Sequence, residues 1–278
     1  IKKFLTVCNE RHLDSLFLSI EPFEEKFYPE IKELLLKHTI SFNIPYRVES
    51  TLNKIIRKDG FKEVLDYIEN RFLYKRNYII RKKSLSGYDF VPTHTSNAIL
   101  QGISEEEKIE IFKTVLDWFI NLKFESFYAI NVIELFSPKK YIDINLKELY
   151  IQLIDKYDSD YQKLLNIIKS LSEFKEKDEN LIDLVIKILE VSFEKLNNEK
   201  QIKKITDQCY VSLTTFGVKT GTPGQPFAVD IQLKELLEKT LNSSKVSELR
   251  IRIFLQNVLK TVQSDIDRVK DEEGEELW

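Results

Sequence analysis

The chain has 278 residues, of which 42% are hydrophobic and 31% charged, and its formal net charge is -3. This composition can bury a substantial core, which excludes a disordered protein, and the near-balanced charge argues against binding nucleic acid through overall charge. Two cysteines, Cys8 and Cys209, are too few for a disulfide framework and are typical of a reducing cytoplasm. Because there is no long apolar run and no signal-peptide core, we expect neither a membrane span nor secretion.

The first third of the sequence predicts helices. Pro29 and Pro45 suit first-turn positions, and Gly60 suits the residue that follows a helix. Apolar residues at helical spacing indicate helices over residues 3–19, 29–38, 45–58 and 61–83.

The segment 104–120 is the clearest predicted helix. Ser104 suits the N-cap position, and Glu107, three residues later, completes a capping box. Four apolar residues are then predicted to share one face: Ile109, Phe112, Leu116 and Phe119. The next apolar segment, 124–136, is predicted to end before Ser137-Pro138, because proline disfavours helical geometry in the residue before it.

Further helical pairs follow at similar spacing. Asp143 or Asn145 can cap one helix, Ser159 can cap its partner, and Asp178 can cap the first helix of the next pair. The residues predicted to face inward are Leu146, Leu149, Tyr150, Leu153 and Tyr157, then Tyr161, Leu164, Leu165, Ile168 and Leu171, then Leu181, Ile182, Val185, Ile188 and Leu189. A last pair is predicted over 229–241 and 245–270, followed by a charged end, DEEGEELW, that we expect to fray.

The predicted helix starts recur at a regular spacing. Ser104, Asp143 and Asp178 are 39 and 35 residues apart. This period is typical of helical-hairpin repeats, in which one unit cannot bury its apolar face alone and neighbours must stack. The sequence therefore predicts an all-α fold, with a HEAT-like, right-handed solenoid of antiparallel helix pairs over 96–278. Residues 84–95 are interpreted as its joint to an N-terminal helical region over 1–95.

The stretch GVKTGTPGQPF, residues 217–227, gathers glycine and proline in an otherwise helical sequence. As a structural corner, Gly217 would end one helix, the prolines would stiffen the crossing, and Asp230 would cap the next helix. Residues 219–222, KTGT, resemble the Lys-Thr-Gly element of penicillin-binding proteins and serine β-lactamases, but the accompanying serine motifs stand in the wrong order. We rank the structural corner first, a contact surface second and a catalytic loop last.

An enzyme or nucleotide-binding module would combine this loop with the 84–95 joint. The glycines let backbone N–H groups approach an anion and Lys219 adds charge, although the spacing is not that of a P-loop. The candidate binding residues under this interpretation are Lys219, Thr220, Thr222, Gln225, Tyr88, Asp89 and His94.

The segment RFLYKRNYIIRKK, residues 71–83, is a candidate nucleic-acid surface. Basic residues with aromatic neighbours can hold phosphates while the rings stack on bases. The interpretation we favour is simpler: cations stabilise a helix C-terminus while the aromatic rings face the core. The basic candidates are Lys75, Arg76, Arg81, Lys82 and Lys83.

The histidine and cysteine positions predict neither a metal site nor a cofactor. His12, His38 and His94 are far apart in the sequence, and no cysteine stands at metal-ligand spacing. No pair of carboxylates stands out as a catalytic acid and base. We therefore favour a protein without a catalytic site.

In its length and its lysine- and isoleucine-rich helices, the chain resembles the C-terminal helical sensor region of large bacterial multidomain ATPases, including antiviral defence proteins. The chain starts at Ile1 and contains no methionine. We therefore expect either a piece of a longer polypeptide or a sequence from which modified methionines have been omitted. The resemblance implies a cytoplasmic portion that recognises a protein ligand or holds subunits together, with ATPase and effector parts upstream. We therefore favour a non-catalytic scaffold or sensor surface for protein recognition.

Overall fold

The computed structural model describes residues 29, 32, 46–68, 100–122, 133, 136–139, 141–174, 176–214, 227–243 and 246–275. Within these residues the regular structure is helical and contains no strand. None of the helices in these ranges is long and apolar enough to cross a membrane. The all-α prediction is therefore confirmed for the part of the chain that the structure describes.

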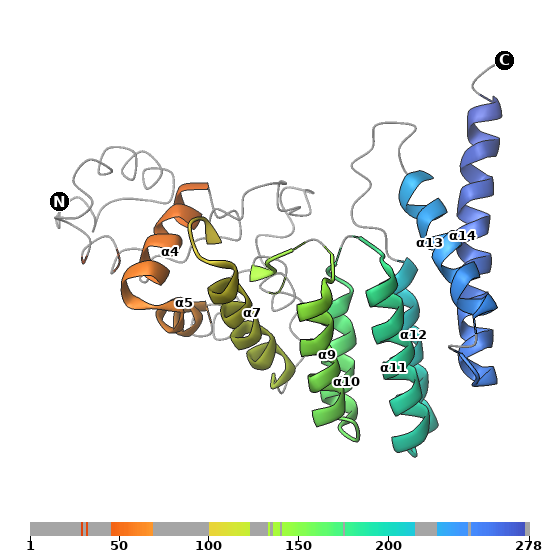
Figure 1. Cartoon of the computed structure of the whole chain (residues 1–278), viewed down its shortest axis with the longest axis horizontal. Helices are drawn as coiled ribbons and strands as arrows, with labels where there is room; N and C mark the ends of the chain where they lie inside the picture. Colours follow the sequence, from red (N-terminus) through yellow and green to blue (C-terminus); the bar gives the residue numbers. More distant parts are fainter. Residues whose placement is uncertain are drawn as a thin grey trace, which may run out of the picture. The chain divides into compact units, whose positions relative to one another are not determined.

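The helices are labelled as in Figure 1. They are α4 (Tyr46–Asp59), α5 (Phe61–Ile68), α7 (Glu105–Ile120), α9 (Ile144–Lys156), α10 (Tyr161–Leu171), α11 (Glu179–Lys195), α12 (Glu199–Thr214), α13 (Phe227–Asn242) and α14 (Leu249–Glu275). The chain divides into two compact units, Ile1–Ile111 and Phe112–Trp278. The predicted helix over 3–19, most of 29–38 and the end of 61–83 lie outside the described residues.

In the first unit, α4 and α5 pack against each other across Gly60. Gly60 has a φ of 90°, a left-handed conformation that favours glycine, and its N–H donates to Ile56 O at 3.0 Å. Asn53 Nδ2 donates to the main-chain oxygen of Gln101 at 2.9 Å. The predicted helix end at Gly60 is confirmed, and the predicted helix over 45–58 corresponds to α4.

The start of α7 follows the sequence prediction. Ser104 Oγ accepts a hydrogen bond from the Glu107 N–H at 3.2 Å, which confirms Ser104 as the N-cap. The buried residues of this helix are Ile111, Phe112, Val115, Leu116, Phe119 and Ile120. Phe136 is helical and buried whereas Ser137 is not helical, as expected for a helix that ends before Pro138.

The second unit contains three antiparallel helix pairs within its described residues: α9 with α10, α11 with α12, and α13 with α14 (Figure 1). Two predicted caps are confirmed. Asp143 Oδ1 accepts from the Leu146 N–H at 3.0 Å, and Asp178 Oδ1 accepts from the Leu181 N–H at 2.8 Å. The five residues predicted to face inward from α11 are all buried.

The predicted cap at Ser159 is wrong by one residue. Asp160 Oδ1 accepts from the Lys163 N–H at 3.2 Å, and α10 begins at Tyr161. A cap bonds an N–H two or three residues ahead, and the carboxylate of Asp160 is the side chain placed to do so. Of the inward-facing residues predicted for α9 and α10, Tyr157 and Tyr161 are only half-buried.

Two predictions near the last helix pair are also wrong. Asp230 lies inside α13, which begins at Phe227, so it does not cap this helix. The charged end was expected to fray, but α14 continues through Glu275. The length of α14 explains the difference. Once a helix of this length has formed, each further residue adds a hydrogen bond without a new nucleation cost, so the helix extends into the acidic segment.

Successive pairs pack on one another in a consistent order. α9 packs against α11, α10 packs against α12, and α14 packs against both α12 and α11. α10 is the most enclosed helix, because Leu164 to Ile168 are five consecutive buried residues and therefore point in all directions around it. Its Asn166 Nδ2 donates to Ile120 O at 3.2 Å, which satisfies a carbonyl at the end of α7.

Candidate functional site

The site residues predicted from the sequence lie outside the part of the chain that the structure describes. These are the loop residues Lys219, Thr220, Thr222 and Gln225, the joint residues Tyr88, Asp89 and His94, and the basic residues Lys75, Arg76, Arg81, Lys82 and Lys83. Whether the loop and the joint come together stays a prediction. The described residues offer a different site, at the start of α9.

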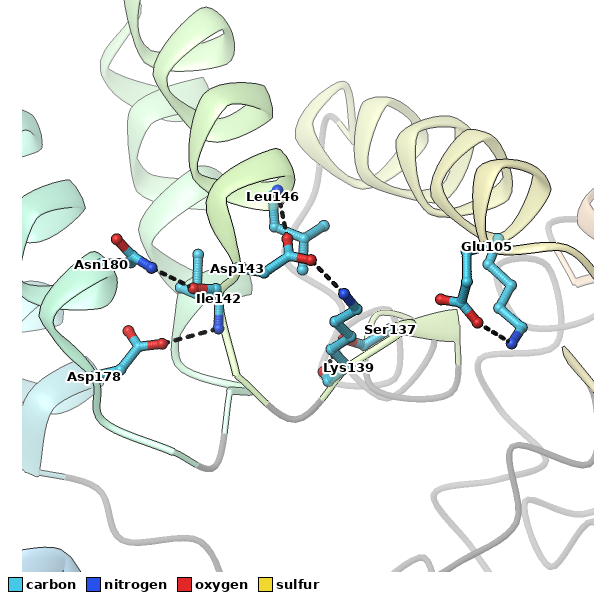
Figure 2. Close-up of polar contacts among 9 residues, drawn as sticks. Glu105, Ser137, Lys139, Ile142, Asp143, Leu146, Asp178 and Asn180 are labelled. Carbon is cyan, nitrogen blue, oxygen red and sulfur yellow. Dashed lines mark hydrogen bonds and ion pairs between the residues drawn. The ribbon is translucent and has the colours of Figure 1, made fainter.

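This site is the segment from Ser137 to Ile144, without residue 140, which we call the 137–144 edge. Ser137 Oγ donates to Lys139 O at 2.8 Å and closes a turn after the preceding helix. Lys139 Nζ then forms an ion pair with Asp143 Oδ2, while the other oxygen of Asp143 caps α9 (Figure 2). The side chains of Lys139 and Asp143 thus fix the path of the chain into α9.

Ile142 fastens the edge to the next helix pair. Its side chain is fully buried. Its N–H donates to Asp178 Oδ2 at 3.2 Å, and its carbonyl oxygen accepts from Asn180 Nδ2 at 2.7 Å (Figure 2). Both main-chain polar groups of Ile142 therefore bond to the N-terminal end of α11, so the backbone here is held as firmly as in regular secondary structure.

The two carboxylates differ in pKa for physical reasons. Burial alone would raise the pKa of Asp143, but the hydrogen bonds from Lys139 and the Leu146 N–H outweigh it, and the pKa is lowered. Burial raises the pKa of Asp178, against the lowering effect of the N–H groups of Leu181 and Ile142. The electrostatics of the edge thus serve capping and fastening rather than proton transfer.

Two large apolar side chains project from this fixed backbone into solvent. Tyr141 is 43% exposed and Ile144, the first residue of α9, is 60% exposed. Lys139 Nζ lies 5.9 Å from the centroid of the Tyr141 ring, a cation–π distance that helps to orient the ring. Exposed aromatic and aliphatic side chains on a rigid backbone are features that protein-binding surfaces use.

Lys177, beside the edge, is a second candidate for chemistry. The residue is only 3% exposed, and its Nζ donates to Phe174 O at 2.8 Å. Burial lowers its pKa to about 8, against the raising effect of Glu173 and Asp178. A lysine with a lowered pKa suits amine chemistry, but this one points at the turn that it closes, so we assign it a structural role.

Metal and thiol chemistry gain no support from the described ranges. No group of three or more His, Cys, Asp or Glu residues there could hold a metal ion. Cys209 is fully buried, and burial raises the pKa of its thiol, which makes it an unreactive core residue. This is the inert role that the sequence allows for a small apolar residue.

Sequence reasoning missed the 137–144 edge, although one signal pointed to it. The caps Asp143 and Asp178 are 35 residues apart in the sequence. In the fold, Asp178 lies beside Ile142, the residue before Asp143. Comparison with protein-family models, curated proteins and solved structures gave no match to this chain. Its function is therefore argued from its own geometry.

Proposed function

We propose that this chain is a non-catalytic helical scaffold that recognises another protein. The observation that carries the proposal is the 137–144 edge, where Tyr141 and Ile144 are exposed on a backbone fixed through Ile142 to the next helix pair. Rigid anchors of this type bind without a large loss of conformational entropy, and aromatic residues are frequent among the strongest contributors to interfaces.

The proposed architecture is a HEAT-like solenoid, and the register of the inter-pair contacts supports it. Polar contacts between successive pairs join residues 36 positions apart at three places: Ile142 with Asp178, Lys147 with Asp183, and Ser172 with Gln208. An offset close to one repeat length is expected when equivalent repeats stack on one another. The contacts of Ile142 with Asn180 and of Asp155 with Lys187, 38 and 32 positions apart, fall on either side of this value. Stacked repeats present extended surfaces, which is the physical route from this architecture to binding.

The wider setting of the proposal comes from the sequence. The resemblance to the helical sensor regions of bacterial multidomain ATPases favours a protein ligand or a neighbouring subunit as the partner, with the scaffold at work in the cytoplasm. The loop and basic-segment alternatives, an enzyme or a nucleic-acid-binding domain, depend on residues outside the described ranges and stay predictions. Fold and composition alone do not define a function, so the binding edge is what an experiment must address.

The test is affinity capture with purified protein from a lysate of the cells that encode the chain. The wild type is compared with a Tyr141→Ser, Ile144→Ser double variant. We expect a specific protein to be retained by the wild type and its retention to fall about 30-fold or more in the variant, because losing one interface anchor costs about 2 kcal/mol or more. Circular dichroism and a thermal melt show that the variant is folded.

The matched control is Leu249→Ser, Ile253→Ser. These two residues are also exposed and apolar, at 69% and 47%, but they lie at the start of α14. The control should retain the same protein as the wild type. Equal retention by the wild type and the edge variant, or no protein retained by either, would contradict the proposal.

A further inference from the structure

Three lysines on α12 are distinguished by having no partner. Among the lysine side chains described between Phe112 and Asp267, only Lys200, Lys203, Lys204 and Lys260 take part in no ion pair, side-chain hydrogen bond or ring contact. Most of the other lysines in this range have a partner, often a carboxylate, as in Lys187 with Asp155 and Lys239 with Glu179. Three of the four unmatched cations thus fall within five residues of one helix.

These three lysines share one side of α12 (Figure 1 shows the helix). All three are exposed, whereas Ile205, Cys209 and Leu213 lie in the core. With 100° between successive residues, positions 200, 203 and 204 face away from that buried stripe. The lysines therefore form one continuous cationic surface, which we call the α12 lysine face.

The placement of the lysine face is unfavourable for α12 itself. The helix starts at Glu199, with Asn198 Oδ1 accepting from the Lys200 N–H at 3.0 Å, so the lysines occupy its first two turns. The positive end of the helix dipole disfavours cations there. Lys200 lies in the first turn, where this effect acts, so its unpaired cation breaks a local rule of helix stability, and such breaks are expected where a surface is kept for binding.

We propose that the α12 lysine face binds a short acidic segment of a protein partner. The lysines and the helix dipole add to one positive field, which complements carboxylates. Val211, 41% exposed, follows on the same side of the helix, about 16 Å from Lys200 at 1.5 Å per residue. The exposed Asp207 lies between Lys204 and Val211 on this side, so the segment that fits is a short acidic stretch followed by uncharged residues, the last of them apolar. This inference rests on the proposed function of protein recognition.

The dimensions favour an acidic peptide over nucleic acid. The lysine face spans about 6 Å of helix, whereas duplex DNA carries one charge per roughly 1.7 Å and binding proteins contact about 6–10 phosphates. The exposed carboxylates of Glu199 and Asp207 bound the face at either end along α12 and would repel a longer polyanion. Three lysines match a few carboxylates but not a phosphate backbone.

The experiment selects from a library of random short peptides on the immobilised full chain, in parallel with a Lys200→Glu, Lys203→Glu, Lys204→Glu variant. We expect the wild type to enrich acidic peptides that contain an apolar residue. In fluorescence anisotropy the best synthetic peptide should bind the variant at least about tenfold more weakly, and added salt should weaken its binding to the wild type. The melting temperature of the variant should be equal or higher, because glutamate suits the start of a helix.

The control is the single change Lys260→Glu compared with Lys203→Glu, since both lysines are exposed and unmatched. Peptide binding should fall with Lys203→Glu and stay within about twofold of wild type with Lys260→Glu. Enrichment of peptides without acidic residues, or equal binding by the triple variant, overturns the inference. Binding of a short DNA duplex in place of acidic peptides overturns it in favour of nucleic acid. If a protein is captured through Tyr141 and Ile144 and is retained equally by the triple lysine variant, this inference is refuted while the proposed function stands.

Discussion

The packed helices of the second unit form two rows, α9 with α11 and α10 with α12 and α14. The helices within each row are joined by different chemistry. Between α9 and α11 the side chains form ion pairs, with Lys147 Nζ 2.5 Å from Asp183 Oδ2 and Lys187 Nζ 2.8 Å from Asp155 Oδ1. Between α10, α12 and α14 the joining groups are neutral: Gln208 Nε2 donates to Ser172 Oγ at 3.3 Å, and the hydroxyls of Tyr210 and Thr261 lie 2.6 Å apart.

The difference indicates a division of roles. Ion pairs on an accessible surface contribute little free energy but favour one alignment of two helices over others. Both rows bury apolar side chains, such as Val185 in α11 and Ile168 in α10, and burial is the main source of stability. We infer that the ion pairs of the α9–α11 row help to set the register of the stack, while the buried apolar side chains of both rows supply its stability.

The largest expected effect concerns Lys177, in the turn that joins the two rows. Burial lowers its pKa from 10.5 to about 8, so between these pH values the unfolded chain binds more protons than the folded one. The free energy of unfolding should therefore gain a contribution of up to about 3 kcal/mol as pH rises through this window. The measurement is urea unfolding at both ends of the window for the wild type and for Lys177→Met. The free energy of unfolding should rise with pH in the wild type more than in the variant, and the difference is the contribution of Lys177.

The control for this prediction is Lys200→Met, at an exposed lysine without contacts. It should keep the same rise as the wild type. If the wild type and Lys177→Met gain equally between the two pH values, Lys177 does not titrate in this window in the folded protein.

The next largest effect separates two helix caps, one in each row. Asp178→Ala removes the cap of α11 and leaves the Ile142 N–H without its acceptor, so we expect a loss of about 2 kcal/mol in the free energy of unfolding. Asp160→Ala removes only the cap of α10, and the expected loss is about 1 kcal/mol. Urea denaturation of both variants gives the difference, and losses of equal size would show that the bond to Ile142 adds nothing.

The smallest effect tests the ion pairs directly. A double-mutant cycle on Lys187→Ala and Asp155→Ala should give a coupling of about 0.2–1 kcal/mol that shrinks when salt is added. The Tyr210→Phe and Thr261→Val cycle in the other row should be insensitive to salt. A salt-independent coupling between Lys187 and Asp155 would argue against their pairing through charge.

The sequence predicts the local features of this fold well and its long-range contacts poorly. Ser104, Asp143 and Asp178 are recognisable as caps because a cap acts on an N–H only a few residues ahead. The prediction of Ser159 fails because the neighbouring Asp160 can also cap, and only the turn geometry decides between the two.

The candidate site was less predictable than the helices. Glycine and proline drew attention to residues 217–227, whereas the 137–144 edge depends on the bond from Ile142 to Asp178, a contact 36 residues away that no local pattern reveals. The exposure of Tyr141 and Ile144 also depends on which neighbours pack beside them, because an apolar residue in a sequence is by default expected to be buried.

Asp178 gives the second unit a mechanical property. One of its carboxylate oxygens holds the first turn of α11, and the other holds the chain that leads into α9. Peeling one helix pair from the next therefore removes a bond from the very residue that starts the second pair. Under an applied force, neighbouring pairs should give way together in one step rather than one at a time, as strong coupling between adjacent repeats requires.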